Sequence, residues 1–198
     1  MILSHKYKFV CLNPPKTGSG FREKTLRDHA DVCIITHKKE KLRHWSSLQA
    51  SNYIKSINKD PNDYYWFTFV RNPWERIISH INMRRNHDIK NGREDNLDIE
   101  SFIVNALKED NLFKNYIYRD GKLLDFIGSI ENITEDLSFV LNKLNIDIPI
   151  SSRKDKYIKD FKNEIRSSFT QELVEIIGSA EKEVIEMKKY TFIDCNND

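Results

Sequence analysis

The chain has 198 residues, with 32 Lys and Arg, 30 Asp and Glu, and a formal net charge of +2. This length suits one α/β domain spanning residues 1–198, which can bury a core without disulfide bonds. The near balance of charge gives no global reason to expect nucleic-acid binding, and any basic surface must be local, so we expect no nucleic-acid partner.

The N-terminus and the cysteines indicate the compartment. The N-terminus lacks the apolar segment of a signal peptide, and no stretch approaches the roughly 20 apolar residues of a membrane span. Cys11, Cys33 and Cys195 show no metal-type spacing with one another or with histidine, so we expect free thiols and no metal. These features predict a cytoplasmic protein that does not cross a membrane.

In chain order, the first informative stretch is a strand, a loop and the start of a helix. The apolar residues 9–12 predict the strand, and Lys-Thr-Gly-Ser-Gly at residues 16–20 opens a segment with helical spacing of apolar residues. Glycine lets a backbone fold closely around a ligand, and the first N–H groups of a helix favour an anion. We therefore expect a phosphate-like group here, bound with the help of Lys16 and the hydroxyls of Thr17 and Ser19. An ordinary capped turn is the alternative.

The next elements are a helix over residues 19–30 and a short buried strand over residues 32–35. His37 follows this strand, and ligands of open α/β sheets bind at the carboxyl ends of strands. His37 is therefore expected near the Lys16 loop. The basic residues 38–44 are typical of a solvated loop or helix face, and a guide for an anionic acceptor is the alternative.

A second helix and the most apolar strand follow. Ser46 or Ser47 can cap the helix, which ends before the polar residues 58–63. Residues 64–70 are aromatic and β-branched, which predicts a central strand.

A third helix begins at Pro73 and runs to about Met83. It places Arg71 at the carboxyl end of the central strand and Ser79 two turns into the helix. Residues 84–98 are polar and contain a glycine, which predicts a mobile excursion, such as a lid, and not a domain linker.

The rest of the sequence predicts a helix over residues 99–107, an Asp-Gly hairpin over residues 116–124 and a strand over residues 125–130. A helix capped by Asn132 or Thr134 follows, and then helical segments over residues 157–169 and 171–188. Residues 190–192 are expected to pack against the rest of the protein.

The order of residues in the first loop separates it from a nucleoside-triphosphate site. The Gly-x-x-x-x-Gly-Lys-[Ser/Thr] motif is absent, because Lys16 precedes the glycines. The central strand ends in Arg71 and not in an acidic residue that could hold magnesium. Two cationic sites predict a ligand with two separate anionic groups and no metal between them.

At these residues the chain resembles the sulfotransferases that use 3′-phosphoadenosine 5′-phosphosulfate (PAPS), in particular their short carbohydrate-type branch. Pro-Lys-Thr-Gly-Ser-Gly-Phe at residues 15–21 is similar to the loop that binds the 5′-phosphosulfate, and residues 69–79 are similar to the segment that binds the 3′-phosphate. Residues 120–136 and 190–192 are similar to two later blocks of that branch. The resemblance covers nearly the whole chain and implies a three-layer α/β fold with a parallel central sheet of the nucleotide-kinase, P-loop-like type.

The resemblance also implies roles for single residues. Lys16 would contact the bridging oxygen and the sulfuryl group, while Arg71 and Ser79 would hold the 3′-phosphate. Arg153 and Lys154 resemble a basic loop that closes over that phosphate, although an aspartate replaces the usual following glycine. The residues implied to surround the 5′-phosphate are Thr17, Gly18, Ser19, Gly20 and Phe21.

The implied reaction moves the sulfuryl group from PAPS to a hydroxyl of an acceptor, a carbohydrate or another small molecule, by in-line displacement. Negative charge grows on the leaving phosphate oxygen, where Lys16 would act more strongly in the transition state than in the ground state. Members of this branch are often membrane-anchored, so a chain without an anchor fits a cytoplasmic protein of bacterial or viral origin. The alternatives are a non-catalytic PAPS-binding relic and a small-molecule kinase.

A base must remove the proton of the acceptor hydroxyl. His37 is similar to a histidine at a strand end in some cytosolic members, and His44 is similar to a histidine before the second helix in short carbohydrate-type members. Glu23 on the first helix, or another carboxylate, is the alternative. Because the carboxyl end of a strand holds a side chain toward the crevice better than a charged loop does, the sequence favours His37.

Overall fold

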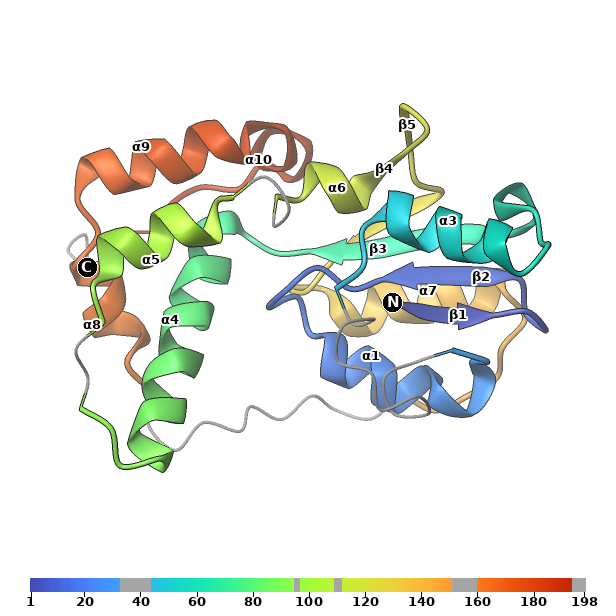
Figure 1. Ribbon diagram of the computed structural model, residues 1–198, viewed down its shortest axis with the longest axis horizontal. Helices are drawn as coiled ribbons and strands as arrows, with labels where there is room; N and C mark the ends of the chain where they lie inside the picture. Colours follow the sequence, from blue (N-terminus) through green and yellow to red (C-terminus); the bar gives the residue numbers. More distant parts are fainter. Residues whose placement is uncertain (33–43, 95–96, 109–111, 151–159, 194–198) are drawn as a thin grey trace. The chain divides into compact units, whose positions relative to one another are not determined.

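The computed structural model describes residues 1–32, 44–94, 97–108, 112–150 and 160–193 (Figure 1). The chain forms two compact units. The sheet unit comprises Met1–Arg71 and Phe113–Arg153, and the helical unit comprises Asn72–Leu112 and Lys154–Asp198. The single domain expected over the whole chain stays a prediction.

The sheet unit is built on a mostly parallel sheet. In the described part of the chain its strands, in spatial order, are β1 (Ile2–Ser4), β2 (Phe9–Leu12), β3 (Tyr65–Val70) and β6 (Phe126–Ser129). Strands β2, β3 and β6 are parallel, and β1 pairs with β2 in the antiparallel direction. The strands expected over residues 9–12, 64–70 and 125–130 are confirmed, whereas β1 is a strand that the sequence pattern does not predict.

Helices cover both faces of this sheet. They are α1 (Ser19–Leu26), α3 (Ser47–Ser56), α6 (Lys114–Ile117) and α7 (Ile133–Lys143). Alternate residues of a strand face opposite sides. Phe9 and Phe67 pack with α1 and α7, whereas Val10 and Trp66 pack with α3 and α6. The predicted α/β architecture, a mostly parallel central sheet flanked by helices, is therefore confirmed.

The segment after β2 agrees with the expectation in part. The helix expected over residues 19–30 is α1 followed by a 3-10 turn, η1 (Arg27–His29). Val32 forms an isolated antiparallel bridge with Leu3, and the rest of the strand expected over residues 32–35 lies outside the described residues. A second 3-10 turn, η3 (Pro61–Asp63), precedes β3.

Two local signals in the sheet unit are confirmed. Ser46 caps α3, because its Oγ accepts from the Gln49 N–H at 3.3 Å and the Gln49 side chain accepts from the Ser46 N–H at 2.9 Å. Asp120 and Gly121 turn the hairpin with φ of +51° and +76°, as its tight two-residue turn requires. The hairpin strands are β4 (Tyr118–Arg119) and β5 (Lys122–Leu123).

The helical unit has an apolar core of its own. Its helices in the described part of the chain are α4 (Pro73–Lys90), α5 (Ile99–Ala106), α8 (Lys162–Ser167), α9 (Gln171–Ala180) and α10 (Lys182–Lys188). Trp74, Ile77, Ile103 and Ile177 are among the buried side chains that join them. No described helix is both long enough and apolar enough to span a membrane.

The polar excursion predicted over residues 84–98 is wrong in its first part, because α4 continues to Lys90. Arg84 Nε lies 2.9 Å from Asp88 Oδ2 one turn further on, and Arg85 Nη1 lies 2.7 Å from Oε1 of Glu164 on α8. Polar residues can extend a helix when i, i+4 pairs and tertiary partners satisfy them. Composition alone does not reveal such partners.

The helical structure predicted over residues 171–188 is confirmed, and it consists of α9 and α10, which meet at a break at Glu181. The Glu181 side chain is 2% exposed, and its Oε1 lies 2.6 Å from Nη2 of Arg76 on α4. This buried ion pair fixes the residue at the break, and its partner is distant in sequence. Of the helix expected over residues 157–169, the described part contains the shorter helix α8.

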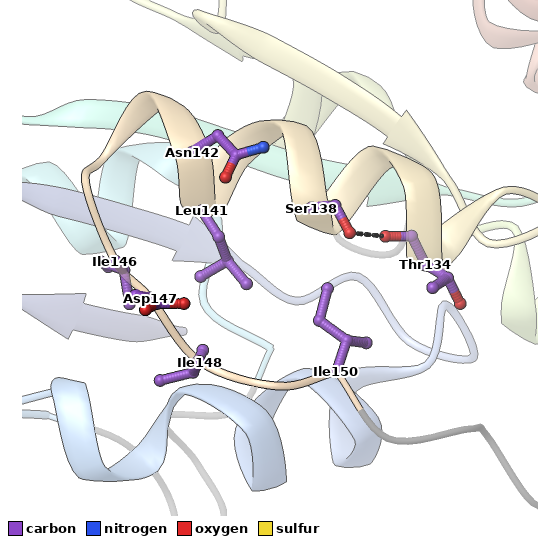
Figure 2. Close-up of a pocket in the computed structure, with 8 residues that line it drawn as sticks. All are labelled: Thr134, Ser138, Leu141, Asn142, Ile146, Asp147, Ile148 and Ile150. Atoms are coloured by element: carbon purple, nitrogen blue, oxygen red, sulfur yellow. Dashed lines mark hydrogen bonds between the residues drawn. The ribbon is translucent and has the colours of Figure 1, made fainter.

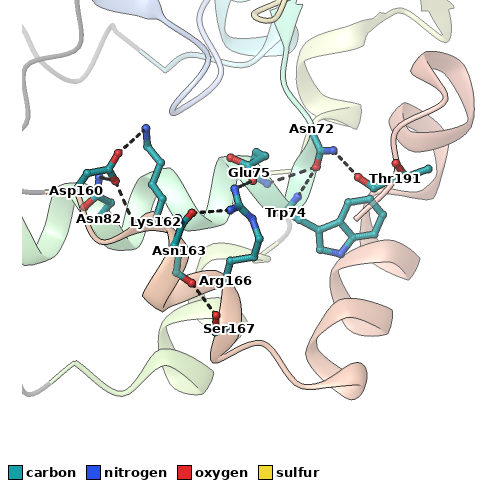
Figure 3. A network of polar contacts seen from close by, with 10 residues as sticks. All are labelled: Asn72, Trp74, Glu75, Asn82, Asp160, Lys162, Asn163, Arg166, Ser167 and Thr191. Atoms are coloured by element: carbon teal, nitrogen blue, oxygen red, sulfur yellow. Dashed lines mark hydrogen bonds and ion pairs between the residues drawn. The ribbon is translucent and has the colours of Figure 1, made fainter. Parts of the chain in front are cut away.

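The start of α4 holds the C-terminal segment (Figure 3). Asn72 caps the helix by accepting from the Trp74 N–H at 3.1 Å, and its side-chain amide donates to the Thr191 carbonyl oxygen at 2.8 Å. The ring centre of Phe192 lies 6.0 Å from that of Trp74. The prediction that residues 190–192 pack the tail down is confirmed.

Candidate functional site

The loop between β2 and α1 has a sharply folded backbone. Lys16 has a φ of +64°, and Gly18, the N-cap of α1, has a φ of +78°. Thr17 between them stays outside the left-handed region. Alternation of this kind can bring successive N–H groups together around an anion. The loop lies at the carboxyl end of β2, where open α/β sheets bind ligands.

The first N–H groups of α1 are available to a ligand. Within the described residues, nothing accepts a hydrogen bond from the N–H groups of Gly18, Ser19 or Gly20. The helical hydrogen bonds begin with Phe21 and Arg22, which donate to the Gly18 carbonyl oxygen at 3.1 and 3.3 Å. Such donors, at the positive end of the helix dipole, favour a group with several negatively charged oxygens.

The two glycines of the loop differ in how much room their surroundings leave for a Cβ atom. A Cβ at Gly18 would lie 3.1 Å from Ile133 Cδ1 and 3.3 Å from Ile130 Cδ1, in addition to the unfavourable φ. A Cβ at Gly20 would meet nothing within 4 Å. Gly18 is therefore required by the packing of the loop on the core, whereas Gly20 leaves open space at the first turn of α1.

Thr17 shapes the loop with its hydroxyl. The side chain is fully buried. Its Oγ1 donates to the Pro14 carbonyl oxygen at 2.8 Å and accepts from Arg22 Nη2 at 3.1 Å. A hydroxyl has one hydrogen, and the Thr17 hydroxyl uses it in the bond to the Pro14 carbonyl oxygen. In this conformation Thr17 can serve a ligand through its backbone, and not through the hydroxyl donor expected from the sequence.

Arg22 is a site residue that the sequence reasoning missed. It is fully buried on α1, and its Nη2 donates to Asn13 Oδ1 at 2.8 Å as well as to Thr17. It therefore joins the end of β2 to the start of α1. The available signal was its spacing, because Arg22 precedes the core residue Leu26 by four positions and so places a cation on the buried face of a helix.

Arg71 reaches the same loop. It follows β3 directly, and β3 is the parallel neighbour of β2. Its Nη1 lies 3.5 Å from the Lys16 carbonyl oxygen, at the outer limit of a hydrogen bond. The two cationic positions that the sequence singled out, Lys16 and Arg71, are thus brought to one edge of the sheet.

His44 is the histidine that the structure places at this loop. Its Nδ1 lies 2.6 Å from the Asn13 carbonyl oxygen, and the Tyr116 hydroxyl donates to the His44 carbonyl oxygen at 2.9 Å. A carbonyl oxygen can only accept, so Nδ1 carries a hydrogen. When the ring is neutral, its lone pair is then on Nε2, and a general base needs such a lone pair.

The remaining candidates divide into three groups. His37, Arg153 and Lys154 lie outside the described residues. Ser79 is buried on α4 in the helical unit. Glu23 is 1% exposed, so its carboxylate is covered by protein and does not face an acceptor in this structure.

A separate cavity of about 310 Å³ lies between α7 and the segment that follows it (Figure 2). Leu141, Ile148 and Ile150 form its apolar side. Asp147 is the charged side chain among the described residues that line it, and no cation lines it. A phosphate-like group therefore fits the loop after β2 better than this cavity.

Among the described residues, no group of three or more His, Cys, Asp and Glu side chains is arranged to hold a metal ion. No protein-family model, curated protein or solved structure matches the chain. The case for the site is therefore the geometry of the loop and of the residues around it.

The different roles of the two glycines can be tested by stability. We expect Gly18→Ala to lower the free energy of unfolding by about 1–3 kcal/mol, because a left-handed φ and a tight Cβ contact both oppose the new side chain. Gly20→Ala should leave it unchanged or raise it, since alanine is favoured in a helix and meets no neighbour. Urea unfolding monitored by tryptophan fluorescence measures both, and equal losses would contradict the loop geometry.

Proposed function

We propose that the chain is a sulfotransferase that transfers a sulfuryl group from PAPS to a hydroxyl of a carbohydrate or another small molecule. The observation that carries this proposal is the convergence of three features at one sheet edge. These are the N–H groups at the start of α1, the left-handed Lys16, and Arg71 within reach of the Lys16 carbonyl oxygen. The nucleotide-kinase, P-loop-like type of the sheet unit and a cytoplasmic location belong to the same proposal.

The proposed roles follow from charge. Bound PAPS supplies the sulfuryl group, and adenosine 3′,5′-bisphosphate (PAP) leaves. The N–H groups of Gly18, Ser19 and Gly20 hold the 5′-phosphate. Lys16 stabilises the negative charge that grows on the bridging oxygen as the S–O bond breaks, which lowers the barrier more than it strengthens ground-state binding. Arg71 holds the 3′-phosphate with charge-assisted hydrogen bonds.

His44 is the base that the geometry supports best. The acceptor oxygen attacks sulfur while its proton passes to the base, and His44 offers the lone pair of Nε2 for that proton when Nδ1 donates to the Asn13 carbonyl oxygen. Asn13 lies at the start of the loop, so the same backbone orients the base and begins the anion site. The sequence favoured His37, which remains the alternative base.

Two other functions remain as rivals. A small-molecule kinase needs a metal ion and an acidic residue to hold it, whereas the residue that follows β3 is Arg71. A non-catalytic binder of the nucleotide would retain the loop and lack turnover. Metal dependence distinguishes the first rival, and turnover with a hydroxyl acceptor distinguishes the second.

Nucleotide selectivity is the first test of this proposal. PAP at about 100 times its Kd should stabilise the folded chain by about 2.7 kcal/mol, because it binds the folded state alone. Adenosine 5′-phosphosulfate, which lacks the 3′-phosphate, and ATP with magnesium should each raise Tm less in thermal unfolding. An equal or larger rise with ATP and magnesium, abolished by a chelator, would favour the kinase.

The two cations should separate binding from turnover. Arg71→Ala should weaken PAP binding about tenfold or more in calorimetry, since it removes a contact to the 3′-phosphate. Lys16→Ala should lower kcat more than it lowers PAPS affinity, since its contact strengthens in the transition state. The exposed Arg27 and Lys24 provide matched alanine controls that should change neither quantity. Wild-type PAP affinity in Arg71→Ala would show that the second anion anchor is misassigned.

The base can be identified by kinetics. His44→Ala should lower kcat by roughly 10²-fold or more with PAP affinity near wild type, and the acidic limb of the pH–rate profile should lose its histidine step. His87→Ala, at an exposed position on α4, is the control. A large loss in His37→Ala with normal turnover in His44→Ala would move the role to His37. Normal turnover in both would exclude a histidine base and direct the search to carboxylates.

A further inference from the structure

Arg22 is one of the largest fully buried side chains of the molecule. Its Nε and Nη2 donate to Asn13 Oδ1 at 3.1 and 2.8 Å, and its Nη2 also donates to Thr17 Oγ1 at 3.1 Å. Its Nη1 donates to the Thr17 carbonyl oxygen. The guanidinium carbon lies 4.8 Å from the centre of the Phe69 ring. These contacts join both ends of the loop to the core beneath it.

The shape of the side chain suits this task. Burying a charge is unfavourable unless its donors are satisfied. A guanidinium is a flat fork that can donate to two residues at once while its face lies on an aromatic ring. An ammonium group is a compact point charge, so lysine at this position could not reproduce the paired contacts to Asn13 and Thr17.

The loop needs such a clamp because its backbone is strained. Lys16 is left-handed, which is unfavourable for a residue with a Cβ. The next residue, Thr17, is held through its carbonyl oxygen and its hydroxyl, both by Arg22. Asn13 Nδ2 is buried and has no hydrogen-bond partner among the described residues. Asn13 Oδ1 accepts both bonds from Arg22 and, in addition, a long contact of 3.8 Å from the Cys11 thiol. The two charge-assisted bonds from Arg22 are therefore the main support of the Asn13 side chain.

We propose that Arg22 is a positioning residue that holds residues 13–18 in the conformation that binds the anion. It acts from behind the loop, through Asn13 and Thr17, and does not contact the ligand. This inference rests on the proposed function for the identity of the ligand, but its conformational part concerns the ligand-free loop.

The expected effect on affinity follows from the fraction of molecules whose loop is in the binding-competent conformation. If the binding-competent loop falls from nearly all molecules to about one tenth, the apparent Kd rises about tenfold, with the intrinsic contacts unchanged. The amide hydrogens at the end of the loop that donate to the Gly18 carbonyl oxygen, those of Phe21 and Arg22, should then also exchange faster in the ligand-free protein. The clamped conformation that protects them is populated less.

The test compares Arg22→Met and Arg22→Lys with two controls in the full chain. Arg27→Met removes an exposed arginine of the following 3-10 turn, and Leu26→Ala removes a core side chain from the same helix. Calorimetry measures PAP affinity, hydrogen exchange with mass spectrometry measures the loop peptide without ligand, and thermal unfolding measures Tm. If Arg22→Met does not fold, Arg22→Lys, which keeps the charge, carries the comparison.

We expect both Arg22 variants to bind PAP about tenfold or more weakly and to exchange faster in the loop. Leu26→Ala should lower Tm while affinity and loop exchange stay near wild type, and Arg27→Met should change none of the three. Wild-type affinity and loop exchange in a folded Arg22 variant would overturn the inference. So would a Leu26→Ala variant that reproduces the affinity loss, because the effect would then be one of general stability.

The two proposals can fail separately. If the wild-type chain does not bind PAP, the proposed function is wrong, and loop exchange in ligand-free Arg22→Lys still decides whether Arg22 positions the loop. If the wild type binds PAP and the Arg22 variants bind it equally well, the function stands and the role of Arg22 is wrong.

Discussion

The parallel pairing of β2 with β3 is the constraint on which the site depends. Leu12 lies opposite Thr68, and the Thr68 hydroxyl donates to the Leu12 carbonyl oxygen at 3.3 Å. Parallel strands end at the same edge of a sheet, whereas antiparallel neighbours end at opposite edges. The loop after β2 and Arg71 after β3 are therefore neighbours because of strand direction. The direction in which β2 and β3 pair thus determines that these two cationic positions lie close together.

The site and the core of the sheet unit use the same residues. Gly18 is pressed against Ile130 and Ile133, and Arg22 lies on the ring of Phe69. Both contacts support the loop from the side of the core, and a site that binds an anion precisely needs support of this kind. In the role proposed for Arg22, a change behind the loop alters affinity through the conformation of the loop and not through a contact with the ligand.

The three residues of the Arg-Asn-Pro triplet after β3 have different structural roles. Arg71 turns back to the Lys16 loop, whereas Asn72 caps α4 and Pro73 begins it. An asparagine at the N-cap and a proline at the first helical position are favoured at the start of any helix. Arg71 is therefore the residue of the triplet that supports the interpretation as an anion site. A strand-to-helix junction without such a site would not need its contact with Lys16.

Local chemistry determined much of this protein. Alternating or continuous apolar runs predicted β2, β3 and β6, and Ser46 and the Asp-Gly turn placed element ends, because periodicity, caps and turns depend on residues a few positions apart. The Lys-Thr-Gly-Ser-Gly sequence at residues 16–20 likewise predicted, from neighbouring residues alone, a loop that could bind an anion. Only tertiary structure decided the length of α4, the break at Glu181 and the nearness of His44 to the loop. Arg76 and Glu181 are 105 residues apart, and Asn13 and His44 are 31 apart. A buried polar group is stable only with such a partner, and a partner that folding brings from elsewhere in the chain leaves no trace in the local pattern.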